Sequence, residues 1–406
     1  MKDQNAQSLL ARVMDWQDED VVRKYVPILQ LLADYKYDQY QRFGPGKRFI
    51  ESLALWLQQF DASDRPAAFD LVMSKLVYFS DAELSHLVQH AYPDVIVQER
   101  MRLVAEEKDI PPHCVGEIAR HPRFKELRLK SLYLGLSDGA RTNELRRAGQ
   151  GEISNEQIWQ AYELGDSKAE EMLEELQKSL TEDEHERKLP TAEEFWRLHD
   201  GEGRVAADKA LAGIIESLPG AKPTAPKPKF NLIWLLDDFS GSGNTYIRFD
   251  GKSGRYKGKI KKIFERLHQG DLIDPSHYEV YLLLYIATRQ AIDHIEYWSE
   301  RFTSENGYKP LQIRVLCPIE REAALTHDLS PSLKAILENP KYYDKHASDK
   351  HIKVGGTDDA NYGFANCALP VVLPHNTPNN SVYVLWGPES YGFYGLFPRV
   401  SRHREF

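Results

Sequence analysis

The sequence predicts an α/β protein in which a parallel sheet, covered by helices on both faces, follows a helical N-terminal domain. Three observations in the 406 residues lead to this fold class. Several short runs are apolar at every position, which is typical of parallel strands buried on both faces. Segments with a three- and four-residue apolar period lie between these runs, as crossover helices would. The first part of the chain carries mainly the helical period.

Residues 1–126 are predicted to form the helical N-terminal domain. Within residues 47–60 the apolar side chains recur at helical spacing and line one face. Ser80 and Glu83 have the spacing of a capping box, and an apolar stripe follows them until Pro93. The histidines of this region have no partner at catalytic or metal-ligand spacing, so we expect no chemistry there.

Residues 127–406 are predicted to form the α/β domain. Its apolar runs are expected to be strands, and they cover residues 127–136, 231–236, 280–286, 311–316 and 368–373. Helices are expected at residues 259–267, 290–302 and 331–338.

A large insertion is expected inside this domain, at about residues 150–229. It starts with a capping box at Ser154 and Gln157, which is expected to open acidic helices that reach about Ser217. Residues 219–229 contain four prolines and three lysines, so they are expected to be a linker or an exposed loop.

The net charge of −9 is concentrated in this insertion. Residues 151–200 contain 15 Asp and Glu against 5 Lys and Arg, and the rest of the chain is nearly neutral. The composition therefore predicts no general attraction to nucleic acid or to an anionic membrane. The acidic stretch is expected to be a solvated helix face or, less often, a docking surface.

The remaining composition favours a cytoplasmic protein without a membrane span. No stretch approaches the roughly 20 apolar residues that a span requires, and the first residues lack the apolar core of a signal peptide. The cysteines Cys114, Cys317 and Cys367 are widely spaced, so neither a disulfide framework nor a structural zinc site is expected.

The most informative segment is the run LLDDFSGSGNT at residues 235–245, where an apolar strand leads into two carboxylates and a loop rich in glycine and hydroxyl groups. Ligands bind beyond the carboxyl ends of parallel strands, so this loop is placed at a site. Its hydroxyl and amide groups, with a following helix N-terminus, are expected to cradle a phosphate. Asp237 and Asp238 would repel a phosphate unless they bound sugar hydroxyls or Mg²⁺.

Together the carboxylates and the cradle predict a ribose 5-phosphate site. A Walker A loop and a GxGxxG loop are both absent from this segment. The loop residues expected to bind the ligand are Ser240, Gly241, Ser242, Gly243, Asn244 and Thr245. A side chain at Gly243 is expected to collide with the phosphate, because the backbone must approach it closely. The alternative is an ordinary turn with two solvated aspartates.

The aliphatic run, the acid pair and the Ser-Gly-x-Thr loop resemble the phosphoribosyl pyrophosphate (PRPP) motif of type I phosphoribosyltransferases. This resemblance implies that Asp237 and Asp238 are catalytic, contact the ribose hydroxyls and bind Mg²⁺. It also implies that Ser242, Gly243 and Thr245 hold the 5-phosphate. Gly241 stands where that family usually has Ser or Thr.

Most of the chain is similar to one subgroup, the phosphoribosyltransferase-like proteins of bacterial conflict systems (PRTase-CE). The helical segments near residues 49–60 and 78–91 resemble the region that precedes the catalytic domain there. Other matching segments are residues 132–141 (LYLGLSDGAR), 236–243 (LDDFSGSG), 376–380 (NTPNN), 385–386 (LW) and 396–399 (LFPR).

Two of these segments are expected to complete the site. Ser137, Asp138 and Gly139 follow a strand, as the pyrophosphate loop does in the resembled enzymes, and Arg141 would supply a bidentate phosphate donor. The alternative is an Asp-Gly turn beside a surface arginine. A second loop with substrate-binding amides is expected at Asn376, Asn379 and Asn380, although it could also be a capped proline turn.

A basic segment follows the phosphate loop. Its seven cations are expected to bind pyrophosphate, RNA or DNA, or to form a solvated helix start. They are Lys252, Arg255, Lys257, Lys259, Lys261, Lys262 and Arg266.

Two functional interpretations remain open. The first is a glycosyltransferase that binds PRPP or a nucleotide with Mg²⁺ and transfers or cleaves at ribose C1, with Arg141 stabilising the leaving pyrophosphate. The second is a non-catalytic nucleotide-binding switch with a regulator docked on the insertion. The resemblance implies an antiphage defence effector, as in a retron-like or other toxin system, with a protein partner. Nucleotide salvage is the less favoured role.

Overall fold

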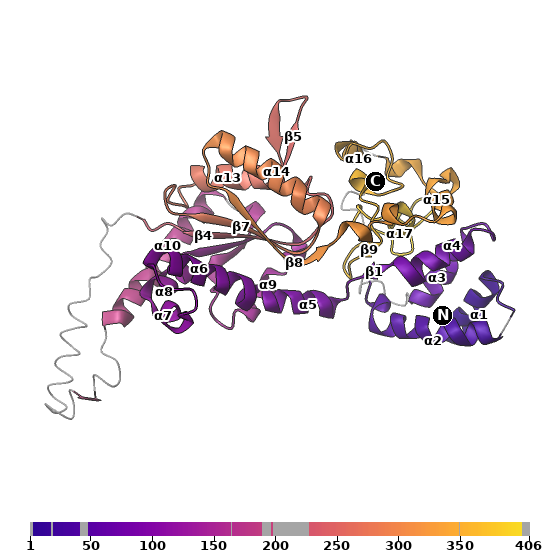
Figure 1. The fold of residues 1–406 in the computed structure, drawn as a ribbon, viewed down its shortest axis with the longest axis horizontal. Helices are drawn as coiled ribbons and strands as arrows, with labels where there is room; N and C mark the ends of the chain where they lie inside the picture. The colour runs from indigo at the N-terminus through magenta and orange to yellow at the C-terminus, as the bar shows by residue number, and fades with distance from the viewer. Residues whose placement is uncertain are drawn as a thin grey trace.

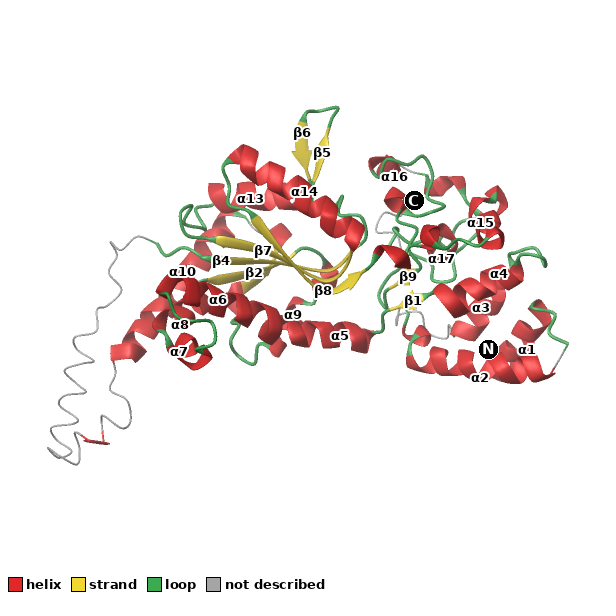
Figure 2. Ribbon diagram, viewed as in Figure 1, coloured by secondary structure: helices red, strands yellow, loops and turns green. Residues whose placement is uncertain are grey.

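The structure is a computed structural model that describes residues 3–17, 19–40, 48–163, 165–188, 196–197, 227–348 and 350–399. A sheet with helices on both faces forms one end of the molecule, and a mostly helical body forms the other (Figures 1 and 2). The helical start and the α/β sheet confirm the predicted fold class. The predicted acidic helices beyond residue 197 and most of the predicted linker lie outside the described residues.

The central sheet has five strands, all parallel, in the order β3-β2-β4-β7-β8. They are β2 (Ser131–Gly135), β3 (Ile158–Gln160), β4 (Leu232–Ser240), β7 (Glu279–Thr288) and β8 (Leu311–Ile319). The short edge strand β3 was not predicted. The capping box at Ser154 and Gln157 opens a 3₁₀ turn that leads into β3, instead of opening the acidic helices as expected.

Alternate side chains of the strands belong to two separate cores. Ile233 and Leu235 of β4 pack on one face, while Trp234 and Leu236 pack on the other. The first face is covered by α10 (Asp166–Lys188), α13 (Lys259–Gln269) and α14 (Arg289–Asn306). The second is covered by α5 (Asp81–His90), α6 (Val97–Lys108), α7 (Val115–Arg120), α8 (Pro122–Leu129) and α9 (Thr142–Ala148). Burial on both faces explains why the central strands β4 and β7 carry long apolar runs.

The strands β2 and β4 are neighbours whose connections run to opposite faces. β2 continues through α9 to β3, whereas β4 continues toward α13 on the other face and then to β7. Such a reversal opens a crevice at the carboxyl ends of the two strands, which is where open α/β sheets bind ligands. The chain leaves β4 through an antiparallel hairpin, β5 (Arg248–Asp250) and β6 (Arg255–Lys257), which projects from the α13 and α14 side (Figure 1).

The second body is assembled from both ends of the described chain. Its elements are α1 (Asp3–Val13), α2 (Glu19–Tyr35), α3 (Phe49–Gln58), α4 (Arg65–Asp70), β1 (Val77–Tyr78), α15 (Pro331–Glu338), α16 (Lys350–Val354), β9 (Val371–Val372) and α17 (Tyr383–Trp386). One hydrophobic core joins the helices before residue 79 to residues 325–397. The boundary at residue 126 stays a prediction, but only α1 to α4 share this core with the far end of the chain, whereas α5, α6 and α7 pack on the sheet.

The strand expected at residues 368–373 is shorter than predicted and lies elsewhere. It is the two-residue strand β9, which pairs with β1 and takes no part in the central sheet. Among the described helices, none combines the length and the apolar character needed to cross a membrane.

The contact between α3 and α17 can be tested by removing one hydrogen bond. Trp56 is fully buried and donates from Nε1 to the carbonyl oxygen of Val384 at 2.9 Å. Trp56→Phe should lower the free energy of unfolding by about 1–3 kcal/mol, because the buried carbonyl loses its donor. Urea unfolding followed by far-UV circular dichroism measures this. Tyr35→Phe removes a donor from an exposed ring and should change stability by less than about 0.5 kcal/mol; equal effects of the two substitutions would refute the assignment.

Candidate functional site

A small cavity of about 160 Å³ lies at the carboxyl ends of β2 and β4. It is lined by Ser137, Asp237, Asp238, Phe239, Ser240, Gly241, Ser242, Gly243, Thr245, Tyr246, Lys259 and Asn380. Nine of these residues were predicted site residues, so the structure brings together the acid pair, the phosphate loop and parts of both flanking loops. Drug-sized ligands fill pockets of roughly 300–1,000 Å³. The cavity therefore matches a sugar phosphate better than a whole nucleotide.

Asp237 uses both carboxylate oxygens within the protein. Oδ1 accepts a hydrogen bond from the Ser137 hydroxyl and another from the backbone N–H of Asp238 at 3.2 Å. Oδ2 accepts from the Tyr246 hydroxyl at 2.8 Å and from Lys259 Nζ at 3.0 Å. The side chain thus ties the loop after β2, the phosphate loop and the start of α13 to the end of β4.

Asp238 points to the opposite face of the sheet, because successive side chains of a strand alternate. It is also buried, yet Oδ2 accepts no hydrogen bond from any residue the structure describes. Nε2 of His375 lies 3.0 Å from this oxygen, at ion-pair distance. A Cβ at Gly139 would lie 2.3 Å from the same oxygen, so this position must be glycine for the carboxylate to fit. Asp238 is the carboxylate with bonding capacity left for a ligand.

The environment treats the two carboxylates differently. Burial raises the pKa of Asp237, the charge of Lys259 opposes this rise, and the neighbouring Asp238 adds to it. Burial acts in the same direction on Asp238, but the imidazole of His375 brings its pKa below the ordinary value. Burial and the carboxylate of Asp237 raise the pKa of Tyr246, so its hydroxyl remains a donor.

The phosphate loop has donors that no described group uses. The Ser240 hydroxyl is buried without a hydrogen-bond partner. The backbone N–H groups of Ser242, Gly243 and Thr245 donate no hydrogen bond within the described chain. Thr288, which caps α14, anchors the loop by donating to the carbonyl oxygen of Gly241 at 2.7 Å. Free amides around a tight turn form an anion-binding nest.

The helix that follows this loop does not begin directly after it, because the β5–β6 hairpin separates the loop from α13. The first two amides of α13 are already used, because Lys259 N and Ile260 N donate to the carbonyls of Thr245 and Tyr246 at 3.1 and 3.0 Å. The loop amides are therefore the main donors for a phosphate here.

Gly243 is required for a different reason from the one expected. Its φ is +77°, and a Cβ there would meet Ala291 O at 2.9 Å and His294 Cδ2 at 2.9 Å. The residue thus faces the backbone of α14, and a side chain would push the loop off the helix rather than collide with a ligand. Asn244, beside it, is half-buried and is not part of the cavity lining.

Arg141 is bound by protein carboxylates. Its guanidinium lies 2.7 Å from Asp81, at the start of α5, and 3.0 Å from Glu144. Arg141 does not line the cavity, and the pyrophosphate-binding role expected for it stays a prediction. Asp138 forms part of the 3₁₀ turn of residues 138–140 and is also outside the lining.

The predicted asparagine loop meets the site only in part. The side chain of Asn380 lies against Gly241, where a Cβ would come within 2.4 Å of it. Asn376 and Asn379 do not line the cavity, but the buried Oδ1 of Asn376 has no hydrogen-bond partner among the described residues. Trp386 is buried and donates to the carbonyl of Ser381, so it is a core residue of this loop.

Sequence reasoning missed two residues that bind the acid pair. Tyr246 follows the loop by one residue, and His375 precedes the asparagine loop. Each of these polar rings lies next to a predicted loop, and this position was the only signal in the sequence. Nothing in the sequence shows which carboxylate either ring would contact. Lys259 was predicted as a member of the basic segment, and the structure places it on Asp237.

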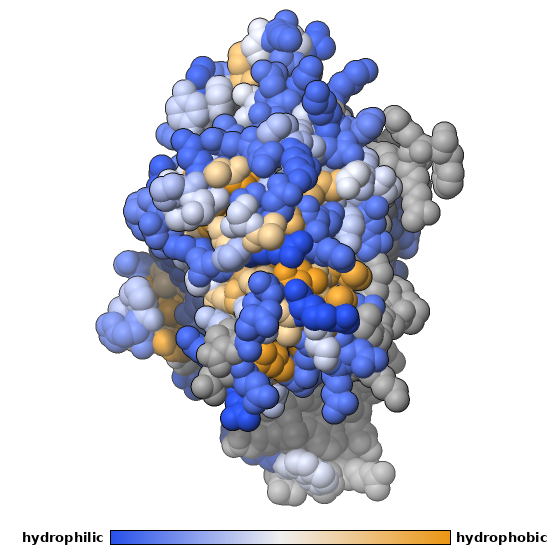
Figure 3. All heavy atoms as spheres, turned by 90° about the vertical axis from the view of Figure 1, so that its right-hand side faces the viewer, coloured by the Kyte–Doolittle hydropathy of each residue, from blue (hydrophilic) through white to orange (hydrophobic). Residues whose placement is uncertain are grey.

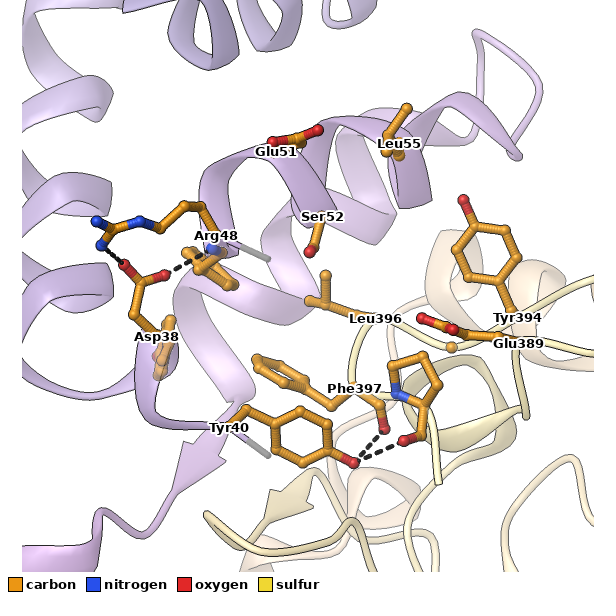
Figure 4. A pocket seen from close by; sticks show the side chains of 14 residues that line it. Asp38, Tyr40, Arg48, Glu51, Ser52, Leu55, Glu389, Tyr394, Leu396 and Phe397 are labelled. Atoms are coloured by element: carbon orange, nitrogen blue, oxygen red, sulfur yellow. Dashed lines mark hydrogen bonds and ion pairs between the residues drawn. The ribbon is translucent and has the colours of Figure 1, made fainter. Parts of the chain in front are cut away.

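A larger cavity of about 410 Å³ lies between α3 and residues 389–398. Figure 4 shows two polar contacts at its wall: Arg48 pairs with Asp38, and the Tyr40 hydroxyl donates to the carbonyls of Phe397 and Pro398. The end of the molecule formed by this body is largely hydrophilic, with apolar side chains gathered near its middle (Figure 3). The smaller cavity is the candidate site, because it holds the predicted acid pair and phosphate loop, and because the Ser240 hydroxyl in it is buried without a hydrogen-bond partner.

The residues of the smaller cavity fit a ribose phosphate and Mg²⁺. The bonding capacity left on Asp238 and Ser240 matches sugar hydroxyls or a metal, and the free loop amides match a phosphate. The described chain holds no cluster of three or more His, Cys, Asp or Glu side chains that could bind a metal. Mg²⁺ commonly binds one or two protein carboxylates together with substrate phosphates, which is what this site could offer.

Comparison with known proteins yields one match. Residues 53–399 match the family model PRTase-CE, so the match covers most of the chain, including the acid pair and all three loops. No curated protein and no solved structure matches the chain.

The unequal roles of the two carboxylates predict unequal effects on stability. Asp237→Asn should lower the free energy of unfolding by about 2 kcal/mol or more, because an amide cannot accept from the Ser137, Tyr246 and Lys259 donors together. Asp238→Asn serves as the matched control, with an expected change below about 1 kcal/mol. Urea unfolding of both variants provides the comparison. If Asp238→Asn were as destabilising as Asp237→Asn, the division of roles would be wrong.

Proposed function

Because the chain belongs to the PRTase-CE family of phosphoribosyltransferase-like proteins, we propose that the crevice between β2 and β4 binds PRPP or a nucleotide through its ribose 5-phosphate. The observation that carries this proposal is a buried carboxylate on Asp238, whose Oδ2 has the His375 imidazole as its charged neighbour, next to free amides in the adjacent loop. A sugar phosphate is a ligand with hydroxyl donors at one end and an anion at the other.

Each part of the site has a task in this proposal. The N–H groups of Ser242, Gly243 and Thr245 bind the 5-phosphate, and the Ser240 hydroxyl adds a donor. Asp238 accepts from the vicinal ribose hydroxyls or holds Mg²⁺. Asp237 positions these groups, because both of its oxygens are used by the protein.

The proposed reaction is transfer or cleavage at ribose C1. The bond from C1 to the leaving group breaks with its electron pair on the leaving oxygen, and an acceptor's lone pair forms the new bond to C1. Lys259 lines the cavity and brings positive charge close to the departing anion. Mg²⁺, when bound, would supply further charge neutralisation for the pyrophosphate. Arg141 can act in this way only if it exchanges Asp81 and Glu144 for the ligand.

A binding module without turnover is a second candidate, and one observation favours it. Only one of the two acid residues has bonding capacity left, because Asp237 is saturated by protein donors. Such a site could hold a nucleotide as a signal and pass its state to a partner protein.

For the biological role, we propose an effector of an antiphage defence system, of a retron-like or other toxin type, that is controlled by a protein partner. The support is the resemblance to proteins of bacterial conflict systems. A reverse transcriptase or an ATPase encoded beside this gene would support the role. A neighbouring purine or pyrimidine pathway would argue for nucleotide salvage instead.

Calorimetric titration with PRPP and Mg²⁺ tests the site. Asp238→Asn should weaken binding about 10- to 100-fold, because it removes a charge-assisted interaction from a buried position. Asp109→Asn is the matched control, since Asp109 is exposed in a left-handed position after α6, which asparagine also adopts readily. It should bind like the wild type. Unchanged affinity in Asp238→Asn would refute the assignment.

Pyrophosphate release separates the enzyme from the binding module. Incubation of the wild-type protein with PRPP and Mg²⁺ should release pyrophosphate, and Asp238→Asn should release at least ten times less at subsaturating PRPP. Asp109→Asn should match the wild type. Tight PRPP binding without pyrophosphate release, with every candidate acceptor and with water alone, would establish the module instead.

A further inference from the structure

The β5–β6 hairpin and the side of α14 that faces it form a surface where aromatic and basic side chains meet; we refer to it as the hairpin surface. Phe249 of β5 is 40% exposed, and Tyr297 of α14 is 53% exposed. Two large aromatic side chains so exposed and so close together are unusual on a protein surface, unless they meet a partner. The hairpin projects away from the helices into the solvent (Figure 2).

The rings of this surface are arranged around Trp298. Phe249 stacks on Trp298, with ring centroids 6.0 Å apart and planes 12° apart, and Tyr297 contacts the same ring edge-on at 4.9 Å. Arg301 lies over both, with its guanidinium carbon 5.5 Å from the Trp298 ring and 5.9 Å from the Tyr297 ring. The result is a rigid aromatic group whose outer rings are open to solvent.

The charge of this surface is positive, in a chain whose net charge is −9. The cations are Arg248, Lys252, Arg255, Lys257 and Arg301, and the acids are Asp250, Asp293, Glu300 and Glu305, of which Asp293 pairs with Arg321 outside this surface. Lys257 pairs with Asp250, and Arg301 pairs with Glu305. Lys252 and Arg255, at the tip of the hairpin, are exposed and take part in no described ion pair.

The predicted basic segment is thus divided by the fold. Lys259 turns to Asp237 in the crevice, Lys261 pairs with Glu265 on α13, and the hairpin cations face outward. The hairpin is also attached to the site, because Arg248 at its base donates to the carbonyl of Asn244 in the phosphate loop at 3.0 Å. A partner on the hairpin surface would lie next to the crevice.

We propose that the hairpin surface binds a single-stranded nucleic acid beside the ribose-phosphate site. Single strands are bound by cations that follow the phosphates and by aromatic rings on which unpaired bases stack. A base has room to stack on Phe249 or Tyr297, while Lys252 and Arg255 reach the phosphates. A duplex hides its base faces, so the exposed rings select against it. This assignment goes beyond the proposed function and holds with or without turnover at C1.

Fluorescence anisotropy with labelled 20-nucleotide oligothymidine and oligouridine measures this binding. The wild-type protein should bind a single strand at least tenfold more tightly than a duplex of the same length. Phe249→Ala together with Tyr297→Ala should weaken single-strand binding about fivefold or more for each stacked base. Tyr162→Ala, which truncates an even more exposed ring elsewhere, is the control and should have no effect.

The salt dependence isolates the two free cations. Lys252→Ser together with Arg255→Ser should reduce the slope of log K against log salt by roughly 1.4, at about 0.7 for each lost phosphate contact. Lys108→Ser together with Arg120→Ser removes the same charges from exposed positions on α6 and α7, and should leave the slope unchanged. Circular dichroism shows whether each variant remains folded.

Three results would overturn the proposal: no oligonucleotide binding at low salt, equal affinity for duplex and single strand, or full binding by the folded aromatic double variant. PRPP titration of the same variants tests the proposed function separately. The hairpin variants should bind PRPP normally, and Asp238→Asn should bind oligonucleotides normally, so the failure of one proposal leaves the other intact.

Discussion

The buried carboxylate of Asp237 is the interaction on which the crevice depends. Its two oxygens collect donors from the loop after β2, from the phosphate loop and from the first residue of α13. Because all three segments donate to the same carboxylate, they are held at fixed positions relative to one another. The loop amides can then bind an anion without reorganising. The neighbouring Asp238 is then available for a ligand because Asp237 has taken over the structural task. An acid pair that looks like two equivalent groups thus consists of one structural anchor, Asp237, and one buried acceptor, Asp238, that faces the other side of the sheet.

Local sequence patterns predicted the parts of the fold that depend on burial and chain order. The apolar runs identified β4 and β7, because strands covered on both faces admit almost no polar side chain. The edge strand β8 is only half-buried and was identified by its alternating apolar residues. The same argument identified the site. Asp237 and Asp238 interrupt an apolar strand at its carboxyl end, which is where parallel sheets bind ligands. The capping box at Ser80 was also confirmed, since its signal lies within four residues. The sequence therefore predicted which residues form the site, but not how the loops that carry them are folded.

The features that could not be predicted depend on contacts between distant segments. His375 reaches Asp238 across a long stretch of chain, and Arg141 turns to Asp81 instead of the crevice. Neither contact can be inferred from the spacing of neighbouring residues in the sequence. Gly243 shows the same limit: the sequence indicated that glycine was needed, but only the position of α14 shows what a side chain would strike. The edge strand β3 was not predicted because a strand of three residues is too short to show an alternating pattern.

The shared core of the chain's two ends has a consequence for biosynthesis. Trp56 and the carbonyl it binds on Val384 are 328 residues apart. At a ribosomal rate of about 5–20 residues per second, the first helices wait roughly 15–65 s for the segment that covers them. During that time their apolar faces are open to the solvent and to chaperones, while the strands of the sheet have already emerged. A translation product that ends before residue 325 would lack the covering segment entirely. The N-terminal helices can therefore bury their apolar faces only after residues 325–397 have been made.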